Sequence, residues 1–223
     1  MEQEHIVGAF DADLDRIKDE ILEMGKLVKK QIRAATNALL EMELEEVDSL
    51  IATDRKINGM NKNINTLAEQ MIAMRQPMAV DLRLALMATN IATELERLGD
   101  HAKSTAKRVR RLSDTSPKKN IMSLVEKMSD LVETMLTNAL KAYKKMDIEG
   151  AAEVRVKDAE VDDINDQIFK MAVNAIKKNP EDIETLIHII LLSRNFERAG
   201  DHIVNIARQV HQIVTGEDLK ASS

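Results

Sequence analysis

One seven-residue stretch occurs twice in the chain, as LERLGDH at residues 95–101 and as FERAGDH at residues 196–202. In the first copy Glu96 stands four residues before Asp100, and the second copy repeats this spacing. On a helix, such a pair of carboxylates lies on one face, one turn apart, where the two charges repel. A glycine inside a helix costs roughly 1 kcal/mol relative to alanine. Because the chain carries both costs twice, we expect the stretch to serve a function.

The composition predicts a helical protein. Of the 223 residues, 44% are apolar, only 2% are aromatic and 13 are methionine, while seven glycines and three prolines leave few breaks for a sheet protein. These numbers favour an aliphatic helical core in which methionine fills gaps. The duplication favours two units of about 110 residues over one large domain. Since the chain has no cysteine, disulfides and thiolate metal sites are excluded.

Charge and hydropathy narrow the function classes. The net charge of −6 gives no general attraction to nucleic acid. No window approaches 18 uninterrupted apolar residues, and the acidic N-terminus lacks the apolar core of a signal peptide. We therefore expect a soluble cytoplasmic protein that binds no nucleic acid directly.

Apolar residues recur at intervals of three and four along most of the chain, which predicts six helices. The predicted helices cover residues 17–42, 47–71, 81–112, 124–146, 151–175 and 183–214. Pro77 and Pro180 end the second and fifth helices, and the stretch 113–117 reads as a linker. The expected fold is all-α, with two tandem three-helix bundles over residues 1–114 and 115–223.

Polar residues interrupt the apolar row of the second helix at Asp54 and Asn61, and again 104 positions later at Asp158 and Asn165. Counting outward from each proline turn predicts which side chains of an antiparallel helix pair lie level. The predicted pairs are Asp54 with Asp100, Asn58 with Glu96, Asp158 with Asp201, and Asp162 with Glu197. We therefore expect three or four oxygen-bearing side chains to meet once per bundle.

Partly buried carboxylates must be neutralised, and the sequence leaves three arrangements open. A hard cation such as Mg²⁺, Mn²⁺, iron or Ca²⁺ binds them, with water completing its shell. Alternatively Arg97, Arg198, Lys103 and the motif histidines form ion pairs with them, or the acids line a solvated groove that binds a basic partner. His101 and His202 lack the Glu-x-x-His spacing of di-iron bundles, so we expect them beside the acids or at the surface rather than on a metal.

The duplicated E-x-x-x-D motif, the stretches Asp54–Asn58 and Asp158–Asp162, and the duplicated length resemble the PhoU family of phosphate-specific transport system accessory proteins. The resemblance implies a pair of three-helix bundles, usually a homodimer, in the bacterial cytoplasm. Some members bind multinuclear iron or zinc clusters through the two motifs, and others are metal-free.

Carried onto this chain, the resemblance implies iron or zinc at two sites, with Glu96, Asp100, Glu197 and Asp201 as ligands. Hairpin counting adds Asp54, Asp158 and Asp162 as ligands, and oxygen ligands also suit Mg or Mn ions. Asn58 stands where the second half has Asp162, so the first site is poorer in negative charge and unequal occupancy is expected.

The resemblance also implies a function. Members act as negative regulators of phosphate uptake and of the phosphate-starvation response. They connect the phosphate ABC transporter's ATPase subunit with the sensor histidine kinase of the phosphate two-component system, and reach the membrane only through these partners. No catalytic constellation is present, so we expect no enzyme. The alternative, a ferritin-like di-metal helical-bundle enzyme, requires a histidine three residues after a glutamate on two helices, which the sequence lacks.

Overall fold

The computed structural model describes residues 2–112 and 119–217, with side chains from residue 11 onward. These residues form six α-helices and one short 3₁₀ helix. In chain order they are α1 (Glu2–Glu41), α2 (Val47–Arg75), α3 (Ala79–Leu112), α4 (Lys119–Lys145), α5 (Ile148–Lys178), η1 (Pro180–Asp182) and α6 (Ile183–Thr215). The all-α prediction is confirmed. The predicted linker at 113–117, and with it the boundary between residues 114 and 115, lies outside the described residues.

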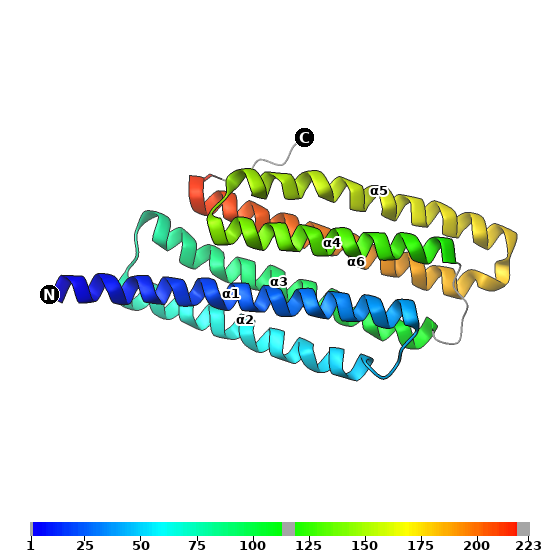
Figure 1. Ribbon diagram of the computed structural model, residues 1–223, viewed down its shortest axis with the longest axis horizontal. Coiled ribbons are helices and arrows are strands. Elements are labelled where there is room, and N and C mark those ends of the chain that lie inside the picture. The colour runs from blue at the N-terminus through cyan, green and yellow to red at the C-terminus, as the bar shows by residue number, and fades with distance from the viewer. Residues whose placement is uncertain (1, 113–118, 218–223) are drawn as a thin grey trace.

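The helices form two antiparallel three-helix bundles that lie side by side (Figure 1). The first bundle contains α1, α2 and α3, and the second contains α4, α5 and α6. Where the bundles meet, α1 packs on α4 and α3 packs on α6, so α2 and α5 lie on the two outer sides. Buried aliphatic side chains run through both bundles as a single core. No helix in the described part of the chain has the length and apolar character needed to cross a membrane.

The duplication extends to the helix ends. Met42 follows α1 with φ 55° and Met146 follows α4 with φ 53°, so both adopt the left-handed conformation. In each case the next backbone N–H donates back to a helix carbonyl at 3.0 Å, Glu43 to Ala38 and Asp147 to Ala142. This is the Schellman arrangement, which satisfies carbonyls left free at a helix end. The two caps are 104 positions apart, the same offset as between α2 and α5.

The contacts between α1 and α4 obey a two-fold relation. Thr36 and Ser129 face each other with their hydroxyl oxygens 2.6 Å apart, both fully buried. Shifting each residue by 104 positions exchanges the helices and gives Leu140 and Gly25. Gly25 lies directly under Leu140, since a Cβ at residue 25 would fall 2.5 Å from Leu140 Cδ1. Equivalent places in the interface therefore hold a hydroxyl pair on one side and a leucine over a glycine on the other.

The predicted apolar stripe of α4 is too narrow. The heptad-like spacing of apolar residues along 124–146 places Leu124, Leu131 and Met146 in the expected stripe, but they are only partly buried. The structure instead buries residues beside them, including Val125, Val132, Leu136 and Tyr143. The reason is that α4 packs against α1, α5 and α6 together, so its buried face is wider than a two-helix seam.

Candidate functional site

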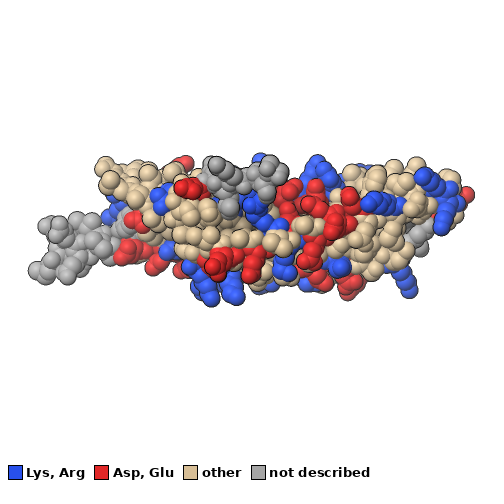
Figure 2. Space-filling view, turned by 90° about the horizontal axis from the view of Figure 1, so that it is seen from above, with Lys and Arg blue, Asp and Glu red and all other residues tan. Residues whose placement is uncertain are grey.

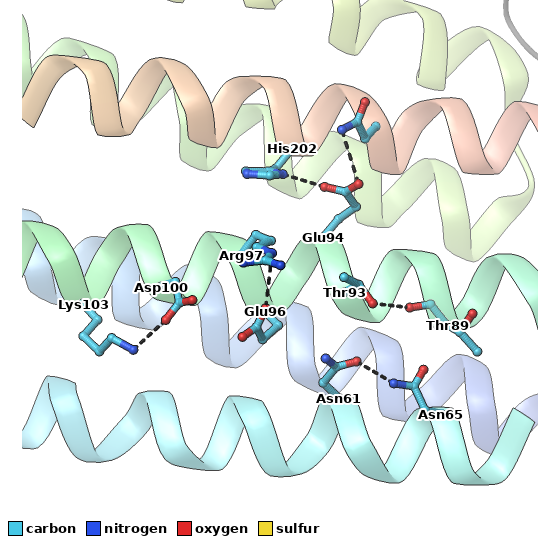
Figure 3. Close-up of polar contacts among 11 residues, drawn as sticks. Asn61, Asn65, Thr89, Thr93, Glu94, Glu96, Arg97, Asp100, Lys103 and His202 are labelled. Atoms are coloured by element: carbon cyan, nitrogen blue, oxygen red, sulfur yellow. Dashed lines mark hydrogen bonds and ion pairs between the residues drawn. The ribbon is translucent and has the colours of Figure 1, made fainter.

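The first bundle brings its predicted acids together between α2 and α3. Lys103 donates from Nζ to Asp54 Oδ2 at 2.8 Å and to Asp100 Oδ1 at 2.5 Å, so the two aspartates share one ammonium group. Figure 3 shows Lys103 and Asp100 on the side of α3 that faces α2. We call Asp54, Asn58, Glu96, Asp100 and Lys103 the first cluster. Hairpin counting predicted that Asp54 and Asp100 meet, and the shared lysine confirms it.

Burial makes the first cluster costly to charge. Asp54 is only 4% exposed, and its Oδ1 has no hydrogen-bond partner among the described residues; the same holds for Asn58 Oδ1. The pKa of Glu96 lies above its ordinary value because the side chain is partly buried and Asp100 adds a like charge, while Arg97 opposes the shift. Arg97 Nε stands 3.8 Å from Glu96 Oε2 (Figure 3). Lys103 is therefore the cation that balances the aspartates.

The second bundle gathers four carboxylates between α5 and α6. We call Asp158, Asp162, Glu197 and Asp201 the second cluster. Burial raises the pKa of Asp158 to about 6, and the charges of the other three acids act in the same direction. Burial and neighbouring acids likewise raise the pKa of Asp162 and of Glu197. Figure 2, which views the molecule from the side that α5 covers, shows a group of acidic side chains near the middle of that face.

The motif glycine explains how α5 brings its acid so close to α6. Gly200 is buried in α6, and a Cβ added to it would lie 2.5 Å from Asp158 Oδ1. Any side chain at residue 200 would therefore displace the Asp158 carboxylate. Glycine keeps this space open, and the roughly 1 kcal/mol lost in helix propensity is the cost of the close approach.

Arg194 forms an ion pair with the second cluster. Arg194 Nη1 lies 3.1 Å from Glu197 Oε1, one helical turn away, while Glu197 Oε2 is buried without a hydrogen-bond partner among the described residues. Arg198 was among the cations expected in the ion-pair arrangement, but the ion pair to Glu197 in the structure comes from Arg194, which lies three positions before it on the same helix face.

The two clusters differ in their fitness for a metal. In the first, an ammonium group already lies between Asp54 and Asp100, so the residues do not fit a second cation there. In the second, the charges of Asp162, Glu197 and Asp201 all act on Asp158, and a buried oxygen of Glu197 has no hydrogen-bond partner among the described residues; oxygen donors of this kind suit a hard cation. Among the residues that the structure describes, no group of three or more histidine, aspartate or glutamate side chains is already arranged as a metal site. Binding at the second cluster would therefore require carboxylate rotation.

The motif histidines lie between the bundles rather than in either cluster. His101 on α3 and His202 on α6 face each other with ring centroids 5.3 Å apart. His202 Nδ1 lies 2.6 Å from Glu94 Oε2, and Asn205 donates to Glu94 Oε1 at 3.3 Å (Figure 3). Burial and the nearby charge of His202 lower the pKa of His101 to about 4, so His101 is neutral at pH 7. Sequence reasoning missed Glu94, which precedes the motif.

A two-fold relation explains this arrangement. The two histidines are 101 positions apart, so each is the repeat equivalent of the other, and the approximate two-fold axis passes between them. The same shift turns the Glu94–Asn205 contact into one between Asn195 and Ser104, which is present at 3.3 Å. Asn195 therefore occupies the place of Glu94 in the other half. The offset of 101 between the repeats is the sequence signal from which the contacts of Glu94 and Asn195 could have been inferred.

Two three-helix repeats, each with a cluster of acids between its last two helices, define a duplicated helical-bundle protein. A family model described as the PhoU domain matches residues 21–109 and again residues 125–210. The chain belongs to the PhoU family. Each match lies within one of the two predicted domains.

Relatives cover almost the whole chain. The phosphate-specific transport system accessory protein PhoU homolog of Caulobacter vibrioides is 33% identical over 216 residues, covering 97% of this chain and 94% of the relative. The homolog of Clostridium acetobutylicum is 31% identical over 211 residues, covering 94% and 96%.

Two solved structures of PhoU proteins have the same fold as this chain. The crystal structure of PhoU from Pseudomonas aeruginosa has a TM-score of 0.89 and 32% identity, covering 93% of this chain and 100% of that one. The phosphate transport system regulatory protein PhoU from Streptococcus pneumoniae also gives a TM-score of 0.89, at 25% identity, covering 95% and 100%. The family is regulatory and non-enzymatic, which confirms the prediction that the chain is not an enzyme.

Proposed function

We propose that the protein is an accessory regulator of phosphate-specific transport that acts by binding partners. In this role it connects the ATPase subunit of the phosphate ABC transporter with the sensor histidine kinase of the phosphate two-component system. It holds uptake and the starvation response down when phosphate is plentiful. The observation that carries the proposal is the match to an accessory protein over 97% of the chain, with both motifs included.

The shape of the molecule suits an adaptor. Long helices cover both outer sides of the paired bundles (Figure 1), and the face drawn in Figure 2 carries many charged side chains. Ile183, Ile187 and Leu191 form an exposed apolar row on α6, at intervals of four residues. Such a row supports contact with another helix, and we propose a homodimer. The protein resides in the cytoplasm and reaches the membrane through its partners.

We further propose that the second cluster binds a metal ion, of iron, zinc, magnesium or manganese. A cation there would neutralise Asp158, Asp162, Glu197 and Asp201 and tie α5 to α6. The orphaned Glu197 oxygen and the space kept open by Gly200 support this assignment. The chain's own contribution is to bring four carboxylates to one region between α5 and α6, with Asp158 and Glu197 partly buried and Asp162 and Asp201 exposed.

A reconstituted membrane experiment tests the adaptor role. Vesicles carrying the phosphate transporter or the kinase are expected to retain the purified protein on flotation, and vesicles without either are not. The variant Ile187→Glu serves to map the α6 row, with the exposed Lys107→Glu on α3 as the matched control. Equal flotation with empty and loaded vesicles, or none with either partner, would contradict the proposal.

A further inference from the structure

The two clusters differ at one structurally decisive position. The motif repeats with an offset of 101, so Lys103 on α3 corresponds to Val204 on α6. Lys103 extends into the first cluster and contacts two carboxylates. Val204 is 6% exposed and brings no charge to the second cluster. The first half also has Asn58 where the second half has Asp162. Both differences make the second cluster more negatively charged than the first.

The lysine ammonium lies where a shared cation would lie. Its Nζ is 2.8 Å from Asp54 Oδ2 and 2.5 Å from Asp100 Oδ1. Asp54 belongs to α2 and Asp100 to α3, so the ammonium group contacts one acid from each helix of the hairpin. These two contacts place the ammonium group between the two carboxylates.

Formal charge separates the clusters further. The first cluster holds three carboxylates and one ammonium, a net charge of −2, whereas the second holds four carboxylates, a net charge of −4. A divalent ion entering the first cluster would meet a fixed positive charge within hydrogen-bond distance of two of its ligands. Entering the second, it would meet four acids whose nearby cations are Arg194, which is paired with Glu197, and the more distant charges of Arg198 and Arg208.

We infer that Lys103 is a covalently tethered counter-ion that occupies the first cluster and excludes metal from it, so that the chain takes a metal ion at the second cluster alone. This inference rests on the proposed metal binding of the second cluster. Lys103 therefore decides how many metal ions the chain binds. Val204, the equivalent residue in the second half, carries no charge and leaves the second cluster free to bind metal.

A reciprocal exchange tests the inference, with Mn²⁺ as the probe. The full chain is dialysed to equilibrium against Mn²⁺, and bound metal is measured by elemental analysis and by the loss of the free-ion EPR signal. We expect the wild type to bind at the second cluster only, Lys103→Val to gain binding at the first, and Val204→Lys to lose at least 100-fold in affinity. The exposed Lys107→Val, one turn beyond Lys103, is the matched control and keeps the wild-type stoichiometry.

Paramagnetic broadening locates the ion independently of stoichiometry. In the wild type, Mn²⁺ is expected to broaden the backbone amide signals of Asp158 and Asp162 on α5 and to leave those of Asp54 and Asn58 sharp, because α2 and α5 lie on opposite outer sides of the molecule. This measurement needs no substitution, so it keeps the inference falsifiable even if Lys103→Val fails to fold. Equal broadening on α2 and α5 in the wild type overturns the inference.

The remaining outcomes separate this inference from the metal proposal. A folded Lys103→Val variant that gains no binding, while the second cluster still binds Mn²⁺, overturns the role of Lys103 and leaves the metal proposal standing. No binding by the wild type at either cluster overturns the metal proposal, and with it the inference.

Discussion

Gly99 and Gly200 occupy the same place in the two copies of the motif but serve different contacts. A Cβ on Gly200 would meet Asp158 Oδ1 at 2.5 Å, whereas one on Gly99 would meet Gln31 Oε1 and Ile57 Cδ1, both at 3.2 Å. Gly99 therefore permits close packing against Gln31 and Ile57, whereas Gly200 makes room for the carboxylate of Asp158. Identical residues at equivalent positions do not imply identical roles.

Gly200→Ala measures the cost of filling this space. We expect the free energy of unfolding to fall by about 1–3 kcal/mol, because the new methyl group forces Asp158 or α6 to move. Gly59→Ala on α2 is the control, since a Cβ there meets nothing within 4 Å. It is expected to raise stability by up to about 1 kcal/mol through helix propensity. Urea denaturation followed by far-UV circular dichroism gives both values, and equal shifts would contradict the assigned role of Gly200.

Asp158 makes stability depend on pH. Its folded-state pKa of about 6 lies above the ordinary 3.8, so the folded protein holds the proton more tightly than the unfolded chain. The resulting stabilisation is complete below about pH 4 and is lost as the pH rises through 6. With a chelator present, we expect the wild type to lose roughly 1 kcal/mol relative to Asp158→Asn between pH 4 and 6.5, allowing for solvent screening of partly exposed acids.

The comparison with Asp158→Asn is essential because His101 acts in the opposite direction. Its pKa is lowered to about 4, so its contribution falls as the pH drops below the ordinary 6.5. His101 is present in both proteins and cancels in the difference. A difference between the two proteins that stays constant over this range would show that Asp158 titrates normally.

At the level of helices, α1 and α4 are held together by unlike contacts at equivalent places. Leu140 packs over Gly25, whereas Thr36 contacts Ser129 through hydroxyl groups. Gly25→Ala adds helix propensity but pushes against the end of a flexible leucine, so the two effects oppose each other. In a Leu140→Ala background only the favourable effect remains.

A double-mutant cycle isolates this contact. We expect Gly25→Ala to be more favourable in the Leu140→Ala background than in the wild type, with an interaction free energy of about 0.5–2 kcal/mol. Chemical denaturation of the four proteins provides the measurement. Strict additivity would mean that Leu140 does not contact the surface around Gly25.

The sequence predicted the helices well because their apolar periodicity is long and regular. It also predicted the level at which acids meet, because Pro77 and Pro180 fix the centre of each hairpin. It did not identify Arg194 or Glu94, whose partners depend on which way a helix is rotated about its axis. The width of the buried face of α4 was missed for a related reason, since it depends on how many helices surround it.

At the level of the whole molecule, the continuous core predicts that both bundles unfold together. Tyr143 in α4 is the single tyrosine of a chain without tryptophan, and it is fully buried. Its near-ultraviolet signal therefore reports on the second bundle, while far-ultraviolet circular dichroism reports on the helices of both. We expect the two denaturation curves to coincide within experimental error. A tyrosine transition that precedes or follows the helix signal would show that the bundles unfold separately.

The histidine pair on the two-fold axis has a consequence for recognition. Rotating an ideally duplicated molecule by half a turn about that axis returns the same outline, so a binding protein would be unable to tell one end from the other. Here the half-turn exchanges Glu94 for Asn195 and Lys103 for Val204, so the outline repeats while the polarity does not. A partner whose binding depends on the charges along these helices would therefore bind in only one of the two orientations.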